Sequence, residues 1–169
     1  LSAENVEGTM SYQRDFELPS ITRPVLIDNI FYEFDKATLT KESEESLDEL
    51  IKLLNLNPNV TIELSSHCDY KGRDEYNVRL SQARAESVVN YLIKGGIEAE
   101  RLTAKGYGEE KPKIVHKKLT EKVSFLKEND VLTEDFIKNL ESEEQQEICN
   151  QLNRRTEFQV LRTTYNLYK

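Results

Sequence analysis

Segments with strand and helix patterns alternate along this chain, and this order limits the available folds more than any other feature. Residues 25–34 are rich in β-forming side chains and end in a polar pair, which predicts a strand. Residues 40–55 predict a helix, because their apolar side chains recur at helical spacing after Thr40, an N-cap candidate. Residues 60–66 alternate apolar and polar side chains, which predicts a second strand.

The alternation continues through the middle of the chain. Residues 75–94 predict a long helix that ends at Gly95-Gly96, and residues 101–107 predict a third strand. Because helices alternate with strands, we expect an α/β (α+β) fold, a mixed sheet with helices packed on it. The first two crossover connections should be right-handed.

The C-terminal third has a less regular pattern. Residues 113–142 contain a short capped helix that starts after Thr133, and a capping-box pattern at Ser142 opens a further helix. Residues 156–165 predict a final strand, which completes the order βαβαβ-α-β. The apolar side chains of residues 113–142 need burial, either against the rest of the domain or against a partner protein.

Chain organisation follows from local composition. Residues 1–24 are polar and contain proline breakers, so we interpret them as a linker or the tail of a preceding domain. Residues 25–169 then form one domain. The N-terminus lacks the basic start and apolar core of a signal peptide, and no apolar run is long enough to span a membrane. We expect the chain to be part of a longer protein.

Charge and rare residues exclude several function classes. The formal net charge of −8 disfavours nucleic-acid binding, which needs a basic face. Cys68 and Cys149 are too few for a disulfide scaffold, although one bridge between them remains open in an oxidising compartment. The two histidines are far apart, and no metal, nucleotide or hydrolase motif is present. The sequence therefore predicts no cofactor, no metal and no catalysis.

The most informative segment joins the second strand to the second long helix. Asp69 comes directly after the strand, and Arg84 follows 15 residues later on the helix. Ligand sites in α/β folds gather where strands end and helices begin. We therefore expect Asp69 and Arg84 near the same end of the sheet.

The amino-acid sequence of this segment matches a specific family motif. Residues 68–85 read CDYKGRDEYNVRLSQARA, which resembles the motif (T/S)DxxGxxxYNxxLSxxRA of OmpA-like C-terminal domains. Three further pieces match in order: Phe34-Asp35, the region from Gly96 to Pro112, and Asn153-Arg154-Arg155 with Glu157. The resemblance covers roughly residues 25–162. This part of the chain is similar to the periplasmic domains of OmpA porins, Pal lipoproteins and flagellar-motor stator proteins.

The resemblance implies non-covalent binding of peptidoglycan through the diaminopimelate of its stem peptide, which anchors a periplasmic or outer-membrane protein complex to the cell wall. Diaminopimelate ends in a zwitterion, and recognition needs one anion and one cation. Asp69 would accept from the ammonium, and Arg84 would hold the carboxylate with its planar guanidinium. The resemblance implies the following ligand-binding residues: Asp69, Arg84, Asn77, Asp35, Leu80, Phe34 and Arg154.

Two departures from the family pattern stand out. Cys68 occupies a position usually held by threonine or serine, and a thiol is a weaker hydrogen-bond partner than a hydroxyl. The segment 113–142 is much longer than the loop usual in the family. With this longer segment, the chain resembles the enlarged OmpA-like domains of multidomain envelope lipoproteins in Bacteroidetes-type bacteria. Some of those lipoproteins belong to secretion machines.

Two other functions compete with the wall anchor. A thiol enzyme would need a base beside Cys68, but the adjacent His67 should point to the opposite face of an extended strand. A protein-interaction module that has kept the fold and lost wall binding is the stronger alternative. It is disfavoured because Asp69, Asn77 and Arg84 are all present at the matching spacing.

Overall fold

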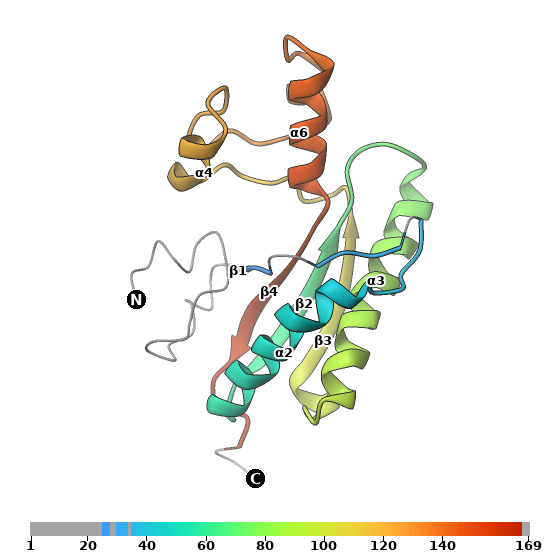
Figure 1. Ribbon diagram of the computed structural model, residues 1–169, viewed down its shortest axis with the longest axis vertical. Helices are drawn as coiled ribbons and strands as arrows, with labels where there is room; N and C mark the ends of the chain where they lie inside the picture. The colour runs from blue at the N-terminus through green and yellow to red at the C-terminus, as the bar shows by residue number, and fades with distance from the viewer. Residues whose placement is uncertain (1–24, 28–29, 34, 167–169) are drawn as a thin grey trace.

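A four-stranded mixed sheet organises the molecule (Figure 1). The computed structural model describes residues 25–27, 30–33 and 35–166. The strand order is β1-β4-β2-β3, with β2 parallel to β3 and antiparallel to β4. The strands are β1 (Val25–Leu26), β2 (Thr61–His67), β3 (Leu102–Gly108) and β4 (Arg155–Arg162). The predicted mixed sheet is therefore confirmed.

The helices fall into two groups (Figure 1). Helices α2 (Lys41–Leu56) and α3 (Asp74–Lys94) pack on one face of the sheet, and helices α4 and α6 lie beyond one end of it. The bounds of the later helices are α4 (Lys117–Lys122), α5 (Glu134–Lys138) and α6 (Glu143–Asn153). None of the helices in the described part of the chain is long and apolar enough to cross a membrane.

The main core lies between the sheet and the helices α2 and α3. The apolar stripe of α2 supplies Leu47, Leu50 and Leu54, all fully buried. They meet the alternate residues of β2 that face the helices, Ile62 and Leu64. Burying each such side chain stabilises the fold by about 2 kcal/mol.

Helix α3 approaches strand β3 unusually closely. A Cβ atom placed on Gly106 would lie 2.1 Å from the backbone nitrogen of Gln82, so only glycine fits there. Gln82 seals the contact, because its Oε1 accepts from the backbone N–H of Gly106 at 2.7 Å and its Nε2 donates to the carbonyl of Ala104 at 3.1 Å. This contact holds the middle of α3 directly against β3.

The predicted strand over residues 25–34 is too long. The structure has a two-residue β1, then an antiparallel bridge between Tyr32 and Leu39. Asp35 turns the chain between them with a φ of 55°. An asparagine or aspartate tolerates this left-handed conformation, whereas strand propensity alone gives no sign of it.

Two boundaries add detail to the predictions. Thr40 is the N-cap residue of α2 as predicted, but its side chain makes no capping bond and instead donates to the carbonyl of Phe31 at 3.3 Å. Arg101 lies in a short 3₁₀ helix, η1 (Ala99–Arg101), rather than in the strand. Its guanidinium is buried and donates to the carbonyls of Leu54, Asn57 and Val60 at the end of α2.

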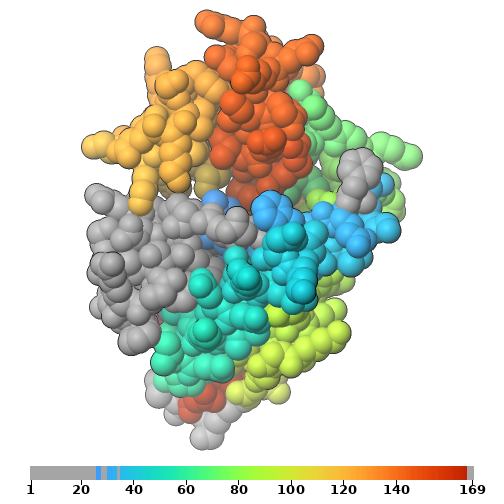
Figure 2. Space-filling view, viewed as in Figure 1, coloured from blue at the N-terminus to red at the C-terminus, as the bar shows by residue number. Residues whose placement is uncertain are grey.

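Residues 113–153 form a separate mass at the end of the sheet (Figure 2), which we name the α4–α6 lobe. Its side-chain caps are as predicted, since Thr133 accepts from the N–H of Phe136 and Ser142 accepts from the N–H of Gln145. The lobe has its own core of buried residues: Val115, Leu126, Leu132, Ile137 and Cys149. Its apolar residues are thus largely buried within the lobe itself.

Candidate functional site

The loop between β2 and α3 places Asp69 at the end of the sheet. Asp69 is 8% exposed, and its Oδ1 accepts from the backbone N–H of Lys71 at 2.9 Å. The preceding residue is tied to β3, because the N–H of Cys68 donates to the carbonyl of Gly108 at 2.8 Å. Asp69 is therefore held on a rigid edge, as the position of the motif predicts.

Asn77 shapes this loop from inside. Its side chain is buried, and its Nδ2 donates to the carbonyl of Lys71 at 2.8 Å. Gly72 has a φ of 91°, and a Cβ there would touch the Asn77 amide at 3.4 Å. In this structure Asn77 supports the loop that carries Asp69, and one of its two amide hydrogens is engaged in this hydrogen bond.

Asp69 also belongs to a chain of ion pairs. Its Oδ2 accepts from Nη1 of Arg154, at the start of β4. Nη2 of the same guanidinium donates to Glu147 of α6 at 2.5 Å, and Lys71 approaches Glu147 at 3.6 Å. Glu147 therefore links the α4–α6 lobe to the carboxylate that the motif singles out.

Arg84 faces a cavity at the same end of the sheet. Its guanidinium lies 4.7 Å above the ring of Tyr32, and its Nε donates to the carbonyl of Lys36 at 3.0 Å. Arg84, Arg154 and Tyr32 all line this cavity of about 500 Å³. Its other lining residues are Ile30, Phe31, Ser66, His67, Gln151, Arg155 and Thr156.

The remaining predicted residues have different positions. Asp35 is exposed, and its Oδ1 accepts from the hydroxyl of Tyr76 at 2.5 Å. Leu80 is half-buried on α3, and neither it nor Asp35 is among the described residues that line the cavity. Phe34 lies outside the described residues.

Electrostatics around Cys68 show that the charged groups of the motif are neighbours. Burial raises the pKa of the Cys68 thiol, which Asp69 raises further, while Arg84 and Arg154 act in the opposite direction. The thiol therefore feels charges of both signs from this end of the sheet. The raised pKa keeps the thiol protonated, which disfavours the thiol-enzyme alternative.

His67 and Cys68 also point away from each other. Nε2 of His67 lies 3.3 Å from Glu157 Oε1, whereas Sγ of Cys68 donates to the carbonyl of Asn77 at 3.5 Å. Both cysteines are free thiols, and Cys149 belongs to the core of the α4–α6 lobe. The disulfide that the sequence left open is therefore absent between these two described residues.

Sequence reasoning missed three residues of the site. Tyr32 stacks under Arg84, and Glu147 holds Arg154. Glu109, after β3, has a pKa raised to about 7 by burial and by the neighbouring Asp74 carboxylate. The contacts of Tyr32 and Glu109 join segments distant in the chain, whereas Glu147 and Arg154 lie seven residues apart at the end of α6.

Comparison with known proteins finds a matching family and similar folds. The model of the OmpA family matches residues 31–124, which is more than half of the chain. Outer membrane protein A of Shimwellia blattae is 43% identical over 89 residues, which are 52% of this chain and 37% of that protein. The chain spans well under two thirds of the curated relatives it matches, with aligned shares such as 13% and 37% of their lengths.

Two solved structures share the fold. The peptidoglycan-associated lipoprotein from Burkholderia pseudomallei has a TM-score of 0.55 and 21% identity, over 78% of this chain and 88% of that chain. The cell wall anchor of the T6SS from Pseudomonas aeruginosa has a TM-score of 0.54 and 22% identity, over 82% of this chain and 79% of that chain. The family match, the similar sequences and the shared fold lead to one conclusion: this chain belongs to the OmpA family.

Proposed function

We propose that this domain binds peptidoglycan without cleaving it, through the zwitterionic end of a diaminopimelate residue, and so anchors a larger envelope protein to the cell wall. The names of two structural neighbours, a peptidoglycan-associated lipoprotein and a cell wall anchor, support wall binding in general. The parent protein would place the domain in the periplasm, associated with the outer membrane. The observation that supports the finer proposal is geometric: Arg154, which pairs with Asp69, lines the same cavity as Arg84. Asp69 and Arg84 do not pair with each other in the described contacts, because Arg84 donates to the carbonyl of Lys36.

In this proposal the ammonium of the ligand binds Asp69. The carboxylate of Asp69 is mostly buried, and a charged hydrogen bond there is stronger than in water. Arg154 occupies Oδ2 of Asp69 in the ligand-free protein, so the ammonium must share or replace that contact. Glu147 keeps a second contact with Arg154 and would hold the guanidinium while the ligand is bound.

The carboxylate of the ligand would bind Arg84. Nε of Arg84 donates to the carbonyl of Lys36, and its two Nη groups would make a bidentate contact with the carboxylate of the ligand. Tyr32 stiffens the guanidinium from below, and the Tyr32 hydroxyl is itself held within 3.1 Å of the Thr156 hydroxyl. The first turn of α3 has no side-chain cap, so its N–H groups are further donors toward an anion.

The test is calorimetric titration of a diaminopimelate-containing muropeptide into wild type, Asp69→Ala and Arg84→Ala. Each substitution should weaken binding by about 2–5 kcal/mol, because it leaves the opposite charge of the ligand unpaired. Arg79→Ala is the matched control, since Arg79 is an exposed arginine on the same helix. Failure of the folded wild type to bind would favour the interaction-module alternative instead.

A further inference from the structure

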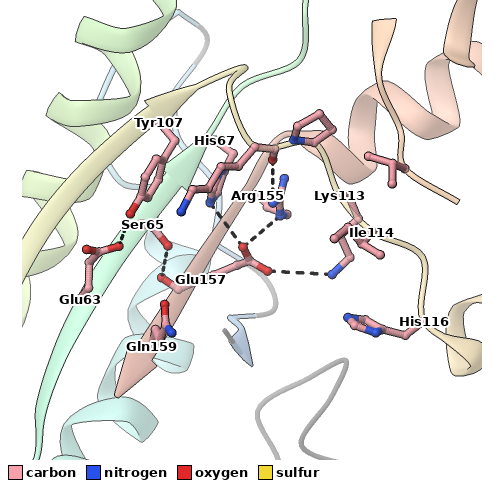
Figure 3. A pocket seen from close by; sticks show the side chains of 13 residues that line it. Glu63, Ser65, His67, Tyr107, Lys113, Ile114, His116, Arg155, Glu157 and Gln159 are labelled. Carbon is pink, nitrogen blue, oxygen red and sulfur yellow. Dashed lines mark hydrogen bonds and ion pairs between the residues drawn. The ribbon is translucent and has the colours of Figure 1, made fainter. Parts of the chain in front are cut away.

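A second cavity, of about 390 Å³, lies on the face of the sheet away from α2 and α3 (Figure 3). Its floor consists of alternate residues of two neighbouring strands, and its rim is the segment that leads from β3 into the α4–α6 lobe. The floor residues are Glu63, Ser65 and His67 from β2, and Arg155, Glu157 and Gln159 from β4. This volume is in the range of small-molecule sites in proteins.

Glu157 is the charged centre of the floor (Figure 3). Its side chain is 9% exposed, with Nε of Arg155 at 3.1 Å, Nε2 of His67 at 3.3 Å and Nζ of Lys113 at 3.9 Å. These partners lower the pKa of Glu157 to about 2 although its burial acts to raise it. Glu157 therefore carries a negative charge that its own neighbours already compensate.

His67 lines the cavity, and its ring nitrogens lack hydrogen-bond partners in the described structure. Neither ring nitrogen makes a hydrogen bond of good geometry, although the side chain is only 3% exposed. Burial lowers the pKa of His67, so the imidazole is neutral, and with Nε2 facing Glu157 its Nδ1 is an acceptor without a donor. Buried polar atoms of this kind are rare unless a ligand or water completes them.

The cationic side chains that line the cavity outnumber its carboxylates. Lys111, Lys113 and Arg155 line the cavity against two carboxylates, Glu63 and Glu157. Glu63 is already engaged, since it accepts from the hydroxyl of Tyr107 at 2.7 Å.

The Lys111 ammonium lies 4.2 Å from the centre of the Tyr107 ring, and no carboxylate of the described residues forms an ion pair with it. Tyr107 in turn stacks on His67, with ring centres 5.2 Å apart. Lys111 therefore stands at the mouth of the cavity, beside the unsatisfied imidazole.

Apolar side chains stand beside this cationic rim. Ile114 is 51% exposed and Val131 is 41% exposed, and an antiparallel bridge between the two residues holds them side by side. Both line the cavity, together with Pro112. A cation next to exposed aliphatic side chains matches a ligand with a negative end and an apolar body.

We propose that this cavity binds a small carboxylate that carries an aliphatic group. The cavity adjoins the one lined by Arg84 and shares His67 and Arg155 with it, but Asp69 and Arg84 do not line it. The ammonium of Lys111 binds the carboxylate, and the aliphatic group covers Ile114 and Val131. Where the ligand also carries an N–H, as an acylated peptide does, Nδ1 of His67 can accept from it. The same chemistry occurs in a free organic acid and in the C-terminal carboxylate of a peptide with an aliphatic last residue.

The test is a nuclear magnetic resonance titration of the whole 169-residue chain. The probes are hexanoate and N-acetyl-alanyl-leucine, and the matched controls are hexanol and N-acetyl-alanyl-leucinamide, which lack the carboxylate. We expect saturable shifts of the backbone amides of residues 111–116 and 131 with at least one acid and with neither control. Tighter binding of the dipeptide identifies a peptide C-terminus, and tighter binding of hexanoate identifies a free acid.

Two variants locate the site. Lys111→Gln should weaken binding of the acid roughly ten-fold, because it removes a charged hydrogen bond. Lys117→Gln is the control, since Lys117 is an exposed lysine of α4 that does not line the cavity, and it should leave affinity unchanged. Absence of saturable shifts at tens of millimolar acid, equal binding of hexanol, or unchanged binding by Lys111→Gln would each overturn the proposal.

Discussion

The sheet with α2 and α3 and the α4–α6 lobe bury their apolar residues in different ways. The first region has a core shared by strands and helices from distant parts of the chain, whereas the lobe closes a small core within one stretch of sequence. The two regions meet at the loop of Asp69, where Tyr70 packs against the core of the lobe and Arg154 pairs with Glu147. Asp69 of the family motif therefore lies in the first region, whereas Glu147, which pairs with its partner Arg154, lies in the lobe.

The largest expected effect tests whether the two cores are independent. Leu64 and Ile137 are both fully buried, one in each core. Leu64→Ala should reduce the free energy of global unfolding by about 4 kcal/mol, whereas Ile137→Ala should mainly increase local opening of the lobe. Hydrogen exchange measures this, and equal loss of protection in β2 after either substitution would show a single cooperative unit.

The next effect concerns Glu157, where a strand of the sheet meets Lys113 of the lobe. Because its pKa is lowered to about 2, ionised Glu157 stabilises the fold fully above its ordinary pKa near 4.5, and this contribution is lost as pH falls toward 2. Glu157→Gln should therefore lower stability at pH 7 by about 3 kcal/mol and by much less near pH 2. Denaturant unfolding at several pH values measures the difference, and a pH-independent effect would contradict the account.

A smaller effect of opposite sign is expected at Glu109. Its pKa is raised to about 7 by burial and by the carboxylate of Asp74, with Glu134 of the lobe contributing. The fold favours the protonated form of Glu109. The contribution of this group to folding stability is therefore fully present below pH 4.5 and is lost as pH rises through 7. Glu109→Gln should stabilise the protein by about 1 kcal/mol at pH 8 and change little at pH 4. Thermal unfolding at both pH values provides the measurement.

The smallest effect concerns the link between the regions. Glu147→Gln removes one of the two carboxylates that hold Arg154, so the guanidinium should bind Asp69 more firmly. Muropeptide affinity should then fall by about 0.5 kcal/mol, because the partly exposed ion pair is weak. Glu143→Gln, at an exposed residue of the same helix, is the control. Stronger binding by Glu147→Gln would mean that the lobe restrains the site instead of supporting it.

Sequence patterns predicted most of the regular elements and the neighbourhood of the site. The apolar stripe of α2, the cap at Ser142 and the motif from Asp69 to Arg84 are local signals, and the structure contains each of them. The turn at Asp35 was missed, because strand propensity does not report a left-handed residue inside an apolar run.

The partners of the charged residues could not be predicted. Arg154 is 85 residues from Asp69 in the chain, and the Tyr32 ring is 52 residues from Arg84. Such contacts depend on the strand order and on the size of the α4–α6 lobe, which no local pattern specifies. The motif supplied candidate residues for the site, while the fold determined which groups contact them.

The most direct test of the central claim asks whether Arg84 holds the carboxylate of a zwitterion. Amidation of diaminopimelate removes that charge and leaves the ammonium in place. Calorimetry with amidated and unamidated muropeptides, on wild type and Arg84→Ala, separates the two ends. The account predicts that amidation weakens binding by wild type and has little further effect on Arg84→Ala. Equal weakening in both proteins, or equal affinity of wild type for both ligands, would contradict it.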